Sequence, residues 1–266
     1  MNSLQAVAVI PARMGSSRFP GKPLARILGL PMVEHVYRRV AMCRLLQGVY
    51  VATCDREIYE SVCGFGGESI MTSPTHPTAS DRVAEAAQHI SADILVMVQG
   101  DEPMVLPEMI DRAVAAMLHD PAIGCVNLVR RITEESEFLD PNTIKVVMDR
   151  EGNALMFSRE PIPTRRLLGF GSVHAFKQVC IIPFRRQTLL QYARVRRGVA
   201  ELAESVDMLR LVEHGVKVRM VETEFDTHAV DTREDLQAVE KRMLRDALTR
   251  QYAPQAPQVG RRLVAG

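Results

Sequence analysis

The sequence predicts an α/β fold with a doubly wound, mostly parallel sheet and helices on both faces. Two observations support this prediction. Residues 6–11 and 94–98 are apolar throughout, the pattern of central parallel strands whose two faces are both covered. Segments with apolar residues at helical spacing alternate with such strands over the first half of the chain, as successive βαβ units do.

The expected elements of the first half follow one another regularly. We expect strands at residues 6–11, 48–53, 67–72 and 94–98, and helices at residues 31–43, 55–62, 80–90 and 107–118. In the first helix, Val33, Val36, Tyr37 and Val40 recur at the spacing that places them on one face.

The second half is more mixed. We expect strands at residues 125–130, 144–148, 179–183 and 217–221, and helices at residues 201–214 and 232–249. The turn-forming residues 150–153 would close a hairpin, and Gly215 lies where a glycine commonly ends a helix. Residues 165–171 should form a surface loop. We expect a single domain over residues 1–252 and a flexible tail at residues 253–266.

Composition excludes several classes of protein. The 266 residues contain 33 Lys and Arg and 32 Asp and Glu, which argues against binding to nucleic acid or to an anionic membrane. No apolar run reaches the roughly 18–20 residues of a membrane helix. The five cysteines form no Cys-x-x-Cys pair, so we expect reduced thiols and a cytoplasmic protein.

The loop after the first strand carries the strongest chemical signal. Residues 10–24 read Ile-Pro-Ala-Arg-Met-Gly-Ser-Ser-Arg-Phe-Pro-Gly-Lys-Pro-Leu, with Arg13, Arg18 and Lys22 among small residues. Small residues let backbone N–H groups approach an anion and the cations add charge, so the loop predicts a triphosphate site. The spacing is not that of a Walker P-loop. A solvated basic loop is the alternative.

Two acidic residues follow apolar segments. Asp101 comes directly after the strand at 94–98, at the sheet edge where open α/β folds bind ligands. A lone carboxylate there suits Mg²⁺, which completes its shell with phosphate oxygens and water. Asp231 ends a second apolar segment in the same way. The alternatives are a turn or helix cap for Asp101 and the N-cap of the last helix for Asp231.

Two further segments could contact a ligand. Glu201, Glu204, Asp207 and Arg210 recur every three residues, which would place three carboxylates on one helical face, ready for sugar hydroxyls. An exposed acidic face is the alternative. Residues 75–82, Thr-His-Pro-Thr-Ala-Ser-Asp-Arg, would cap a helix and could contact a nucleotide base.

Taken together and in order, these motifs resemble a known family. Besides the basic loop and Gly-Asp-Glu-Pro at 100–103, the chain contains Asn142 with Lys-Val-Val at 145–147, Phe-Ser-Arg at 157–159, and Val-Asp-Thr at 230–232. Over roughly residues 6–245 the chain resembles the 3-deoxy-manno-octulosonate cytidylyltransferases, also called CMP-Kdo synthetases.

The resemblance implies a Rossmann-like nucleotidyltransferase fold with a smaller dimerisation and sugar-side subregion. It implies Mg²⁺, a homodimer, and CTP and a 3-deoxy-ulosonic acid (Kdo or a close relative) as substrates of lipopolysaccharide biosynthesis. By position, the nucleotide would be bound by Arg13, Ser16, Lys22, Thr78, Ser80, Arg82 and Gln99. The sugar would be bordered by Arg159, Gln178, Glu201, Glu204 and Asp207. Lys22, Arg13 and Asp101 would be catalytic, and Asp101 and Asp231 would hold the metal.

The chain departs from the family pattern at three positions. Ala79 replaces a glycine, and Gln178 and Ile182 replace a histidine and a tyrosine on the sugar side. If residues 178–182 form one strand, these two side chains share a face, and we expect an altered sugar pocket. The alternative functions are a sugar-1-phosphate nucleotidyltransferase and a non-catalytic homologue that binds sugar nucleotides.

Overall fold

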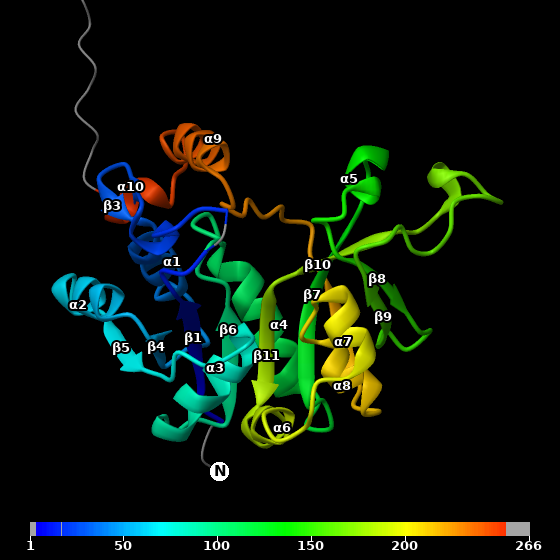
Figure 1. The fold of residues 1–266 in the computed structure, drawn as a ribbon, viewed down its shortest axis with the longest axis horizontal. Helices are drawn as coiled ribbons and strands as arrows, with labels where there is room; N and C mark the ends of the chain where they lie inside the picture. The colour runs from blue at the N-terminus through cyan, green and yellow to red at the C-terminus, as the bar shows by residue number, and fades with distance from the viewer. Residues whose placement is uncertain (1–3, 17, 254–266) are drawn as a thin grey trace, which may run out of the picture.

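The computed structural model describes residues 4–16 and 18–253, and a ten-stranded sheet lies at its centre (Figure 1). The first half supplies β1 (Ala6–Ala12), β4 (Gly48–Thr53), β5 (Glu68–Met71) and β6 (Ile94–Val98). The second half supplies β7 (Cys125–Arg131), β8 (Lys145–Met148), β9 (Ala154–Ser158), β10 (Phe176–Val179), β11 (Ile181–Arg185) and β12 (Val218–Glu222). The strands lie in the order β5-β4-β1-β6-β11-β7-β10-β8-β9, and β12 pairs with β7.

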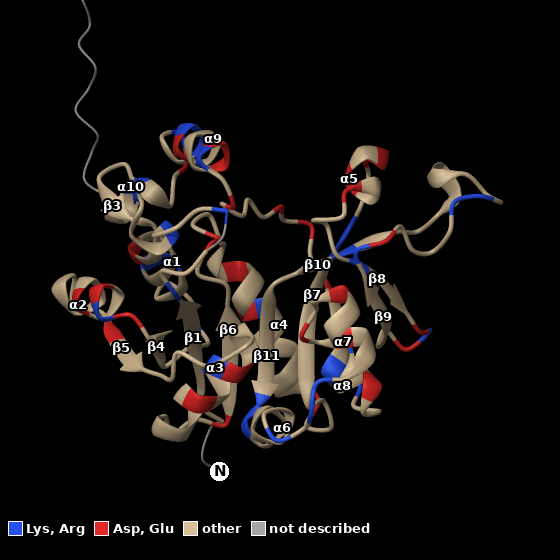
Figure 2. Ribbon diagram, in the orientation of Figure 1, with Lys and Arg blue, Asp and Glu red and all other residues tan. Residues whose placement is uncertain are grey.

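Helices cover both faces of the sheet, which confirms the predicted fold class. One core cluster joins Ala8 and Ile10 of β1 to α1 (Met32–Val40), α2 (Arg56–Gly64) and α4 (Pro107–His119). The other joins Val7 and Val9 to α3 (Ala79–Ala86), α6 (Arg186–Tyr192) and α8 (Leu209–Glu213). Burial on both faces explains why β1 and β6 are apolar throughout and carry no charged residue (Figure 2).

Most of the strands run in one direction. The pairings make β1, β4, β5, β6, β7, β8 and β12 point one way, and β9, β10 and β11 the other. The strand predicted at residues 179–183 is divided at Cys180, because β10 pairs with β7 and β8 whereas β11 pairs with β6 and β7. The Asn127 side-chain amide donates to the Val179 carbonyl at this break (2.7 Å).

The prediction of a single helix at residues 201–214 is wrong. The chain forms α7 (Val199–Glu204), turns at Ser205, whose φ of 53° is left-handed, and then forms α8. Val206 and Met208 in the turn are buried in the core, so tertiary packing overrides helix propensity here. Gly215 follows α8 with a φ of 71°, as predicted for the residue that ends it.

The predicted helix at 232–249 is shorter than expected: it comprises α9 (Arg233–Met243) and, after a turn, α10 (Thr249–Tyr252). The smaller elements are β2 (Arg26–Ile27), β3 (Leu30–Pro31), α5 (Glu135–Leu139) and the 3₁₀ turns Lys22–Leu24, Ala87–His89 and Phe170–Ser172. Apart from Ala253, the predicted tail lies outside the described residues. Within the described part of the chain, no helix is long and apolar enough to span a membrane.

Candidate active site

A cavity of about 330 Å³ lies at the carboxyl ends of β1 and β6, where open α/β sheets commonly bind ligands. Four segments line it: the loop after β1, the start of α3, the turn after β6 and the residue just before the cap of α9. The predicted nucleotide and metal segments therefore come together from distant parts of the sequence.

The loop after β1 turns back on itself beside the cavity. The backbone N–H groups of Ser16 and Gly21 both donate to the Met14 carbonyl, at 2.9 and 3.0 Å. Gly21 has a φ of 73°, a left-handed conformation that glycine adopts without steric cost. This turn carries Arg13, Ser16 and Lys22 to the cavity wall.

Lys22 links the two predicted metal ligands. Its Nζ lies 2.8 Å from Asp101 Oδ2 and 3.2 Å from Asp231 Oδ1. Arg18 Nη2 reaches the same Asp231 oxygen at 3.0 Å. The Lys22 side chain is only 12% exposed, so this charge is fixed in the cavity floor rather than free in solvent.

Asp231 is not the N-cap of the last helix. The Thr232 hydroxyl accepts from the Asp235 backbone N–H, and the Asp235 carboxylate accepts from the Thr232 backbone N–H, which forms a capping box. The Val230 N–H donates to the Asp101 carbonyl (2.9 Å) and so brings Asp231 beside Asp101. The structure therefore excludes the capping alternative for Asp231.

The carboxylates of Asp101 and Asp231 fit a divalent cation. Both offer hard oxygen donors, and both already contact one cation, the Lys22 ammonium. Among the described residues there is no group of three or more His, Cys, Asp or Glu that could hold a metal. Phosphate oxygens and water would therefore have to complete a Mg²⁺ shell, as is usual for this ion.

The turn after β6 approaches β1 closely. A Cβ on Gly100 would lie 2.8 Å from the Pro11 carbonyl oxygen, so any larger residue would push this turn and β1 apart. Gln99 and Asp101 on either side of this glycine both line the cavity.

The start of α3 forms a second wall. Thr78 caps the helix by accepting from the Asp81 backbone N–H, as the sequence predicted, and Thr78 and Arg82 line the cavity. Ser80 does not line it. Its side chain is fully buried and its hydroxyl donates to Asp207 Oδ2 (2.6 Å), so the structure does not bring Ser80 to the cavity with the other predicted nucleotide residues.

The three acidic residues expected on one helical face lie apart, because the helix breaks at Ser205. Buried Glu201 pairs with Arg210 and Arg197. The Glu204 carboxylate accepts from the Ser158 hydroxyl and the Arg159 N–H. Asp207 accepts from Ser80, and burial raises its pKa above the usual value. The prediction that the three carboxylates share one helical face is therefore wrong, and each of them has protein partners.

The remaining sugar-side residues also have protein partners. Arg159 donates to the Glu204 and Pro141 carbonyls, and the Gln178 side-chain amide donates to Asn127 Oδ1 (2.6 Å). Ile182 is 1% exposed within the core. The inference that Ile182 alters a pocket wall is therefore wrong, because its side chain lies in the core.

Sequence reasoning missed two residues at the site. His76 lines the cavity and contacts Glu85, although the sequence showed no histidine cluster. Glu102, next to Asp101, has one carboxylate oxygen that is buried without a hydrogen-bond partner among the described residues. Burial and the charge of Asp101 raise the pKa of Glu102 to about 8. The quoted motifs 75–82 and 100–103 contain both residues, but sequence alone gave neither a role.

Comparisons with known proteins agree with this geometry. A family model described as cytidylyltransferase matches residues 7–245. A 3-deoxy-manno-octulosonate cytidylyltransferase of Geobacter metallireducens is 46% identical over 225 residues, which cover 81% of this chain and 89% of the relative. The enzyme of that name from Escherichia coli is 40% identical over 215 residues, with 81% and 86% covered.

A solved structure of a CMP:2-keto-3-deoxy-manno-octonic acid synthetase complexed with CTP superposes with a TM-score of 0.85 at 39% identity. The match covers 91% of this chain and 99% of that one. The chain therefore belongs to the cytidylyltransferase family and, within it, to the 3-deoxy-manno-octulosonate cytidylyltransferases.

Proposed function

We propose that the protein transfers CMP from CTP to the anomeric hydroxyl of 3-deoxy-manno-octulosonate (Kdo) and releases pyrophosphate. The observation that carries this proposal is the position of Lys22 between Asp101 and Asp231, beneath a basic loop at the end of β1. The names of the relatives supply the two substrates.

In this reaction the anomeric oxygen attacks the α-phosphorus in line, and the bond from that phosphorus to the pyrophosphate oxygen breaks. Negative charge on the phosphoryl oxygens is the main obstacle. Arg13, Ser16 and Lys22 would bind the phosphates, so that fixed positive charge and hydrogen-bond donors already face that charge. Thr78, Arg82 and Gln99 would bind the rest of the nucleotide.

Asp101 and Asp231 would hold Mg²⁺. The metal would supply further positive charge at the phosphates and make a contacting hydroxyl easier to deprotonate. The two aspartates would also orient the Lys22 ammonium, which lies within 3.2 Å of both.

For the acceptor we propose a site that Arg159, Glu204 and Asp207 border from the side of α7. The Arg159 guanidinium could pair with the sugar carboxylate by exchanging its present bond to the Pro141 carbonyl. Glu204 orients this guanidinium, because the Arg159 Nε donates to the Glu204 carbonyl (2.8 Å) and the Arg159 backbone N–H donates to the Glu204 carboxylate (2.8 Å).

We also propose a cytoplasmic homodimer that acts in lipopolysaccharide biosynthesis. Exposed leucines in β9 and in the segment after it support self-association, because large exposed apolar surface marks interaction sites. The five free cysteines fit a reducing compartment.

One assay tests the proposed reaction. Pyrophosphate release is measured with CTP, UTP, ATP and GTP, each combined with a panel of ulosonic acids that includes Kdo and with sugar 1-phosphates. We expect release only with CTP, and most with Kdo. Equal release with UTP or ATP would exclude a cytidylyltransferase, and release with a sugar 1-phosphate would identify a different class of acceptor.

A further inference from the structure

We infer that Arg210 is a positioning residue of the reaction: it holds the first turn of α3, one wall of the nucleotide cavity, in place against α7 and α8. The inference rests on the proposed function, because it concerns how the CTP site keeps its shape. Arg210 itself is not among the residues that line the cavity.

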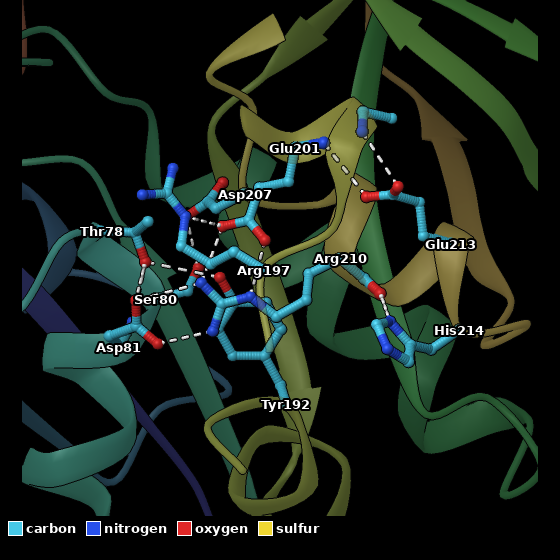
Figure 3. Close-up of polar contacts among 11 residues, drawn as sticks. Thr78, Ser80, Asp81, Tyr192, Arg197, Glu201, Asp207, Arg210, Glu213 and His214 are labelled. Carbon is cyan, nitrogen blue, oxygen red and sulfur yellow. Dashed lines mark hydrogen bonds and ion pairs between the residues drawn. The ribbon is translucent and has the colours of Figure 1, made fainter. Parts of the chain in front are cut away.

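The Arg210 guanidinium binds two carboxylates from different elements (Figure 3). Its Nε and Nη2 donate to Glu201 of α7 at 2.8 and 2.7 Å. Its Nη1 and Nη2 donate to Asp81 of α3 at 2.7 and 3.2 Å. The guanidinium also stacks on the Tyr192 ring, 4.0 Å from the ring centroid. Arg210 therefore joins three elements through one planar group.

These charges are buried. The side chains of Arg210 and Glu201 are 3% and 0% exposed, and that of Asp81 is 11% exposed. Loss of Arg210 would leave two buried carboxylates without a partner, which is strongly destabilising. The ion pairs therefore keep α3 and α7 in contact. Lysine would keep the charge but lacks the planar fork that serves both carboxylates at once.

Arg210 acts on the cavity through Asp81. The Thr78 hydroxyl donates to Asp81 Oδ2 (2.7 Å), and the Asp81 backbone N–H donates to the same hydroxyl (3.2 Å). Thr78, Ala79 and Arg82 face the cavity, whereas Asp81 points away from it toward Arg210. The orientation of Asp81 thus sets the position of the turn that forms the cavity wall.

Two neighbouring contacts reinforce the same junction. Ser80 donates to Asp207, between α7 and α8, and the Tyr192 hydroxyl lies 3.4 Å from the Thr78 hydroxyl (Figure 3). Fully buried Ser80, which the sequence assigned to the nucleotide, therefore helps to hold the wall instead.

The test compares Arg210→Lys and Asp81→Asn with a matched control, Arg197→Lys. Arg197 pairs with the same Glu201 carboxylate, but its side chain is 32% exposed, and its guanidinium hydrogen-bonds Glu201 of α7 rather than Asp81 of α3. CTP affinity is measured by titration calorimetry without acceptor, and kcat and KM are measured by pyrophosphate release.

We expect Arg210→Lys and Asp81→Asn each to raise the Kd and KM for CTP about tenfold, the loss expected for one charge-assisted contact. The kcat should fall less than about threefold, because Lys22, Asp101 and Asp231 lie on other segments. Arg197→Lys should leave all three quantities unchanged. The Kd for CTP of the double variant should equal that of the single variant with the lower CTP affinity, because both changes remove the same contact.

Lowered melting temperatures with an unchanged Kd for CTP would overturn the inference and leave Arg210 a purely structural residue. An equal rise in the Kd for Arg197→Lys would overturn it too. If Arg210→Lys does not fold, Asp81→Asn, which keeps the shape of the side chain, decides by its Kd alone. If the wild type binds CTP but does not use Kdo, the proposed acceptor is wrong, and the CTP affinities still decide the role of Arg210.

Discussion

Lys22 shows how one side chain can organise a polar site. Two carboxylates close together repel each other unless a cation lies between them. The Lys22 ammonium supplies that cation for Asp101 and Asp231, and Arg18 adds a second contact to Asp231. The same charge is available to phosphates entering the cavity. The site therefore carries its compensating charge before any ligand binds.

The two aspartates should be essential for turnover. We expect Asp101→Asn and Asp231→Asn each to lower kcat about 100-fold or more, because either change removes a charge from the proposed metal site, and such a charge is worth several kcal/mol in the transition state. Pyrophosphate release at saturating substrates measures this. Melting temperatures near that of the wild type would show that the fold is intact. Near-normal turnover of either variant would contradict the assigned role.

Asp207 should make stability depend on pH. Burial raises its pKa, although the hydrogen bond from Ser80 opposes the shift. The folded protein then binds this proton more tightly than the unfolded chain, so stability is lost as the pH rises from the usual carboxyl pKa through the raised one. The asparagine of Asp207→Asn does not titrate. The melting temperature of this variant, relative to that of the wild type, should therefore increase as the pH rises. A difference in melting temperature between the two proteins that stays constant from about pH 4 to pH 8 would contradict this prediction.

At the scale of elements, the helix caps fix the two ends of the site. Thr78 begins α3 beside the nucleotide wall, and Thr232 begins α9 immediately after Asp231. In each case the aspartate three positions after the threonine accepts a hydrogen bond from the threonine side chain. The caps thus determine where the adjacent functional residues lie.

Loss of the second cap should cost stability. Thr232→Ala removes the capping box of α9, so we expect the free energy of unfolding to fall by about 1 kcal/mol and the melting temperature by about 2–4 °C. Asp231→Asn is the matched control: it lies one residue earlier and does not cap the helix through its side chain, so the melting temperature should hold. A larger loss for Asp231→Asn would show that its carboxylate, not the cap, stabilises this end.

Sequence patterns predicted the elements best where one physical cause dominates. The strands at 48–53 and 94–98 coincide with β4 and β6. For β6 the cause is plain, because residues buried on both faces must be apolar. The prediction of one helix at 201–214 is wrong because local sequence does not show the tertiary packing that buries Val206 and Met208 and ends α7 at Ser205. Residues 179–183 are divided between β10 and β11, because these strands pair with different neighbours. A local sequence pattern carries no information about which strands pair.

The same distinction holds for the site. The place of Asp101 was predictable because it follows the buried strand β6, and strand ends meet at one edge of a parallel sheet. Asp231 follows no strand, and the hydrogen bond from the Val230 N–H to the Asp101 carbonyl brings it there. The contacts of Asp81 with Arg210 and of Ser80 with Asp207 join residues more than 120 positions apart. Only the folded chain brings those pairs together.

At the scale of the whole molecule, apolar exposure is uneven. Leu167 and Leu168 are 90% and 69% exposed in the segment between β9 and β10, which projects away from the sheet (Figure 1). Leu155 of β9 is 55% exposed as well. Leucines this exposed gain most of their burial energy from a partner surface, about 1.5–3 kcal/mol for each side chain fully buried.

The proposed homodimer predicts how these leucines behave. Light scattering after gel filtration should give twice the chain mass of 29.7 kDa for the wild type. Leu167→Asp combined with Leu168→Asp places charges on the projecting segment, and burying unpaired charge in an interface is unfavourable, so the mass should fall to that of one chain. Leu118→Asp is the matched control, because Leu118 is 38% exposed on α4 and should leave the dimer intact. A wild type that elutes as a monomer, or a double variant that stays dimeric, would contradict the proposed association through this segment.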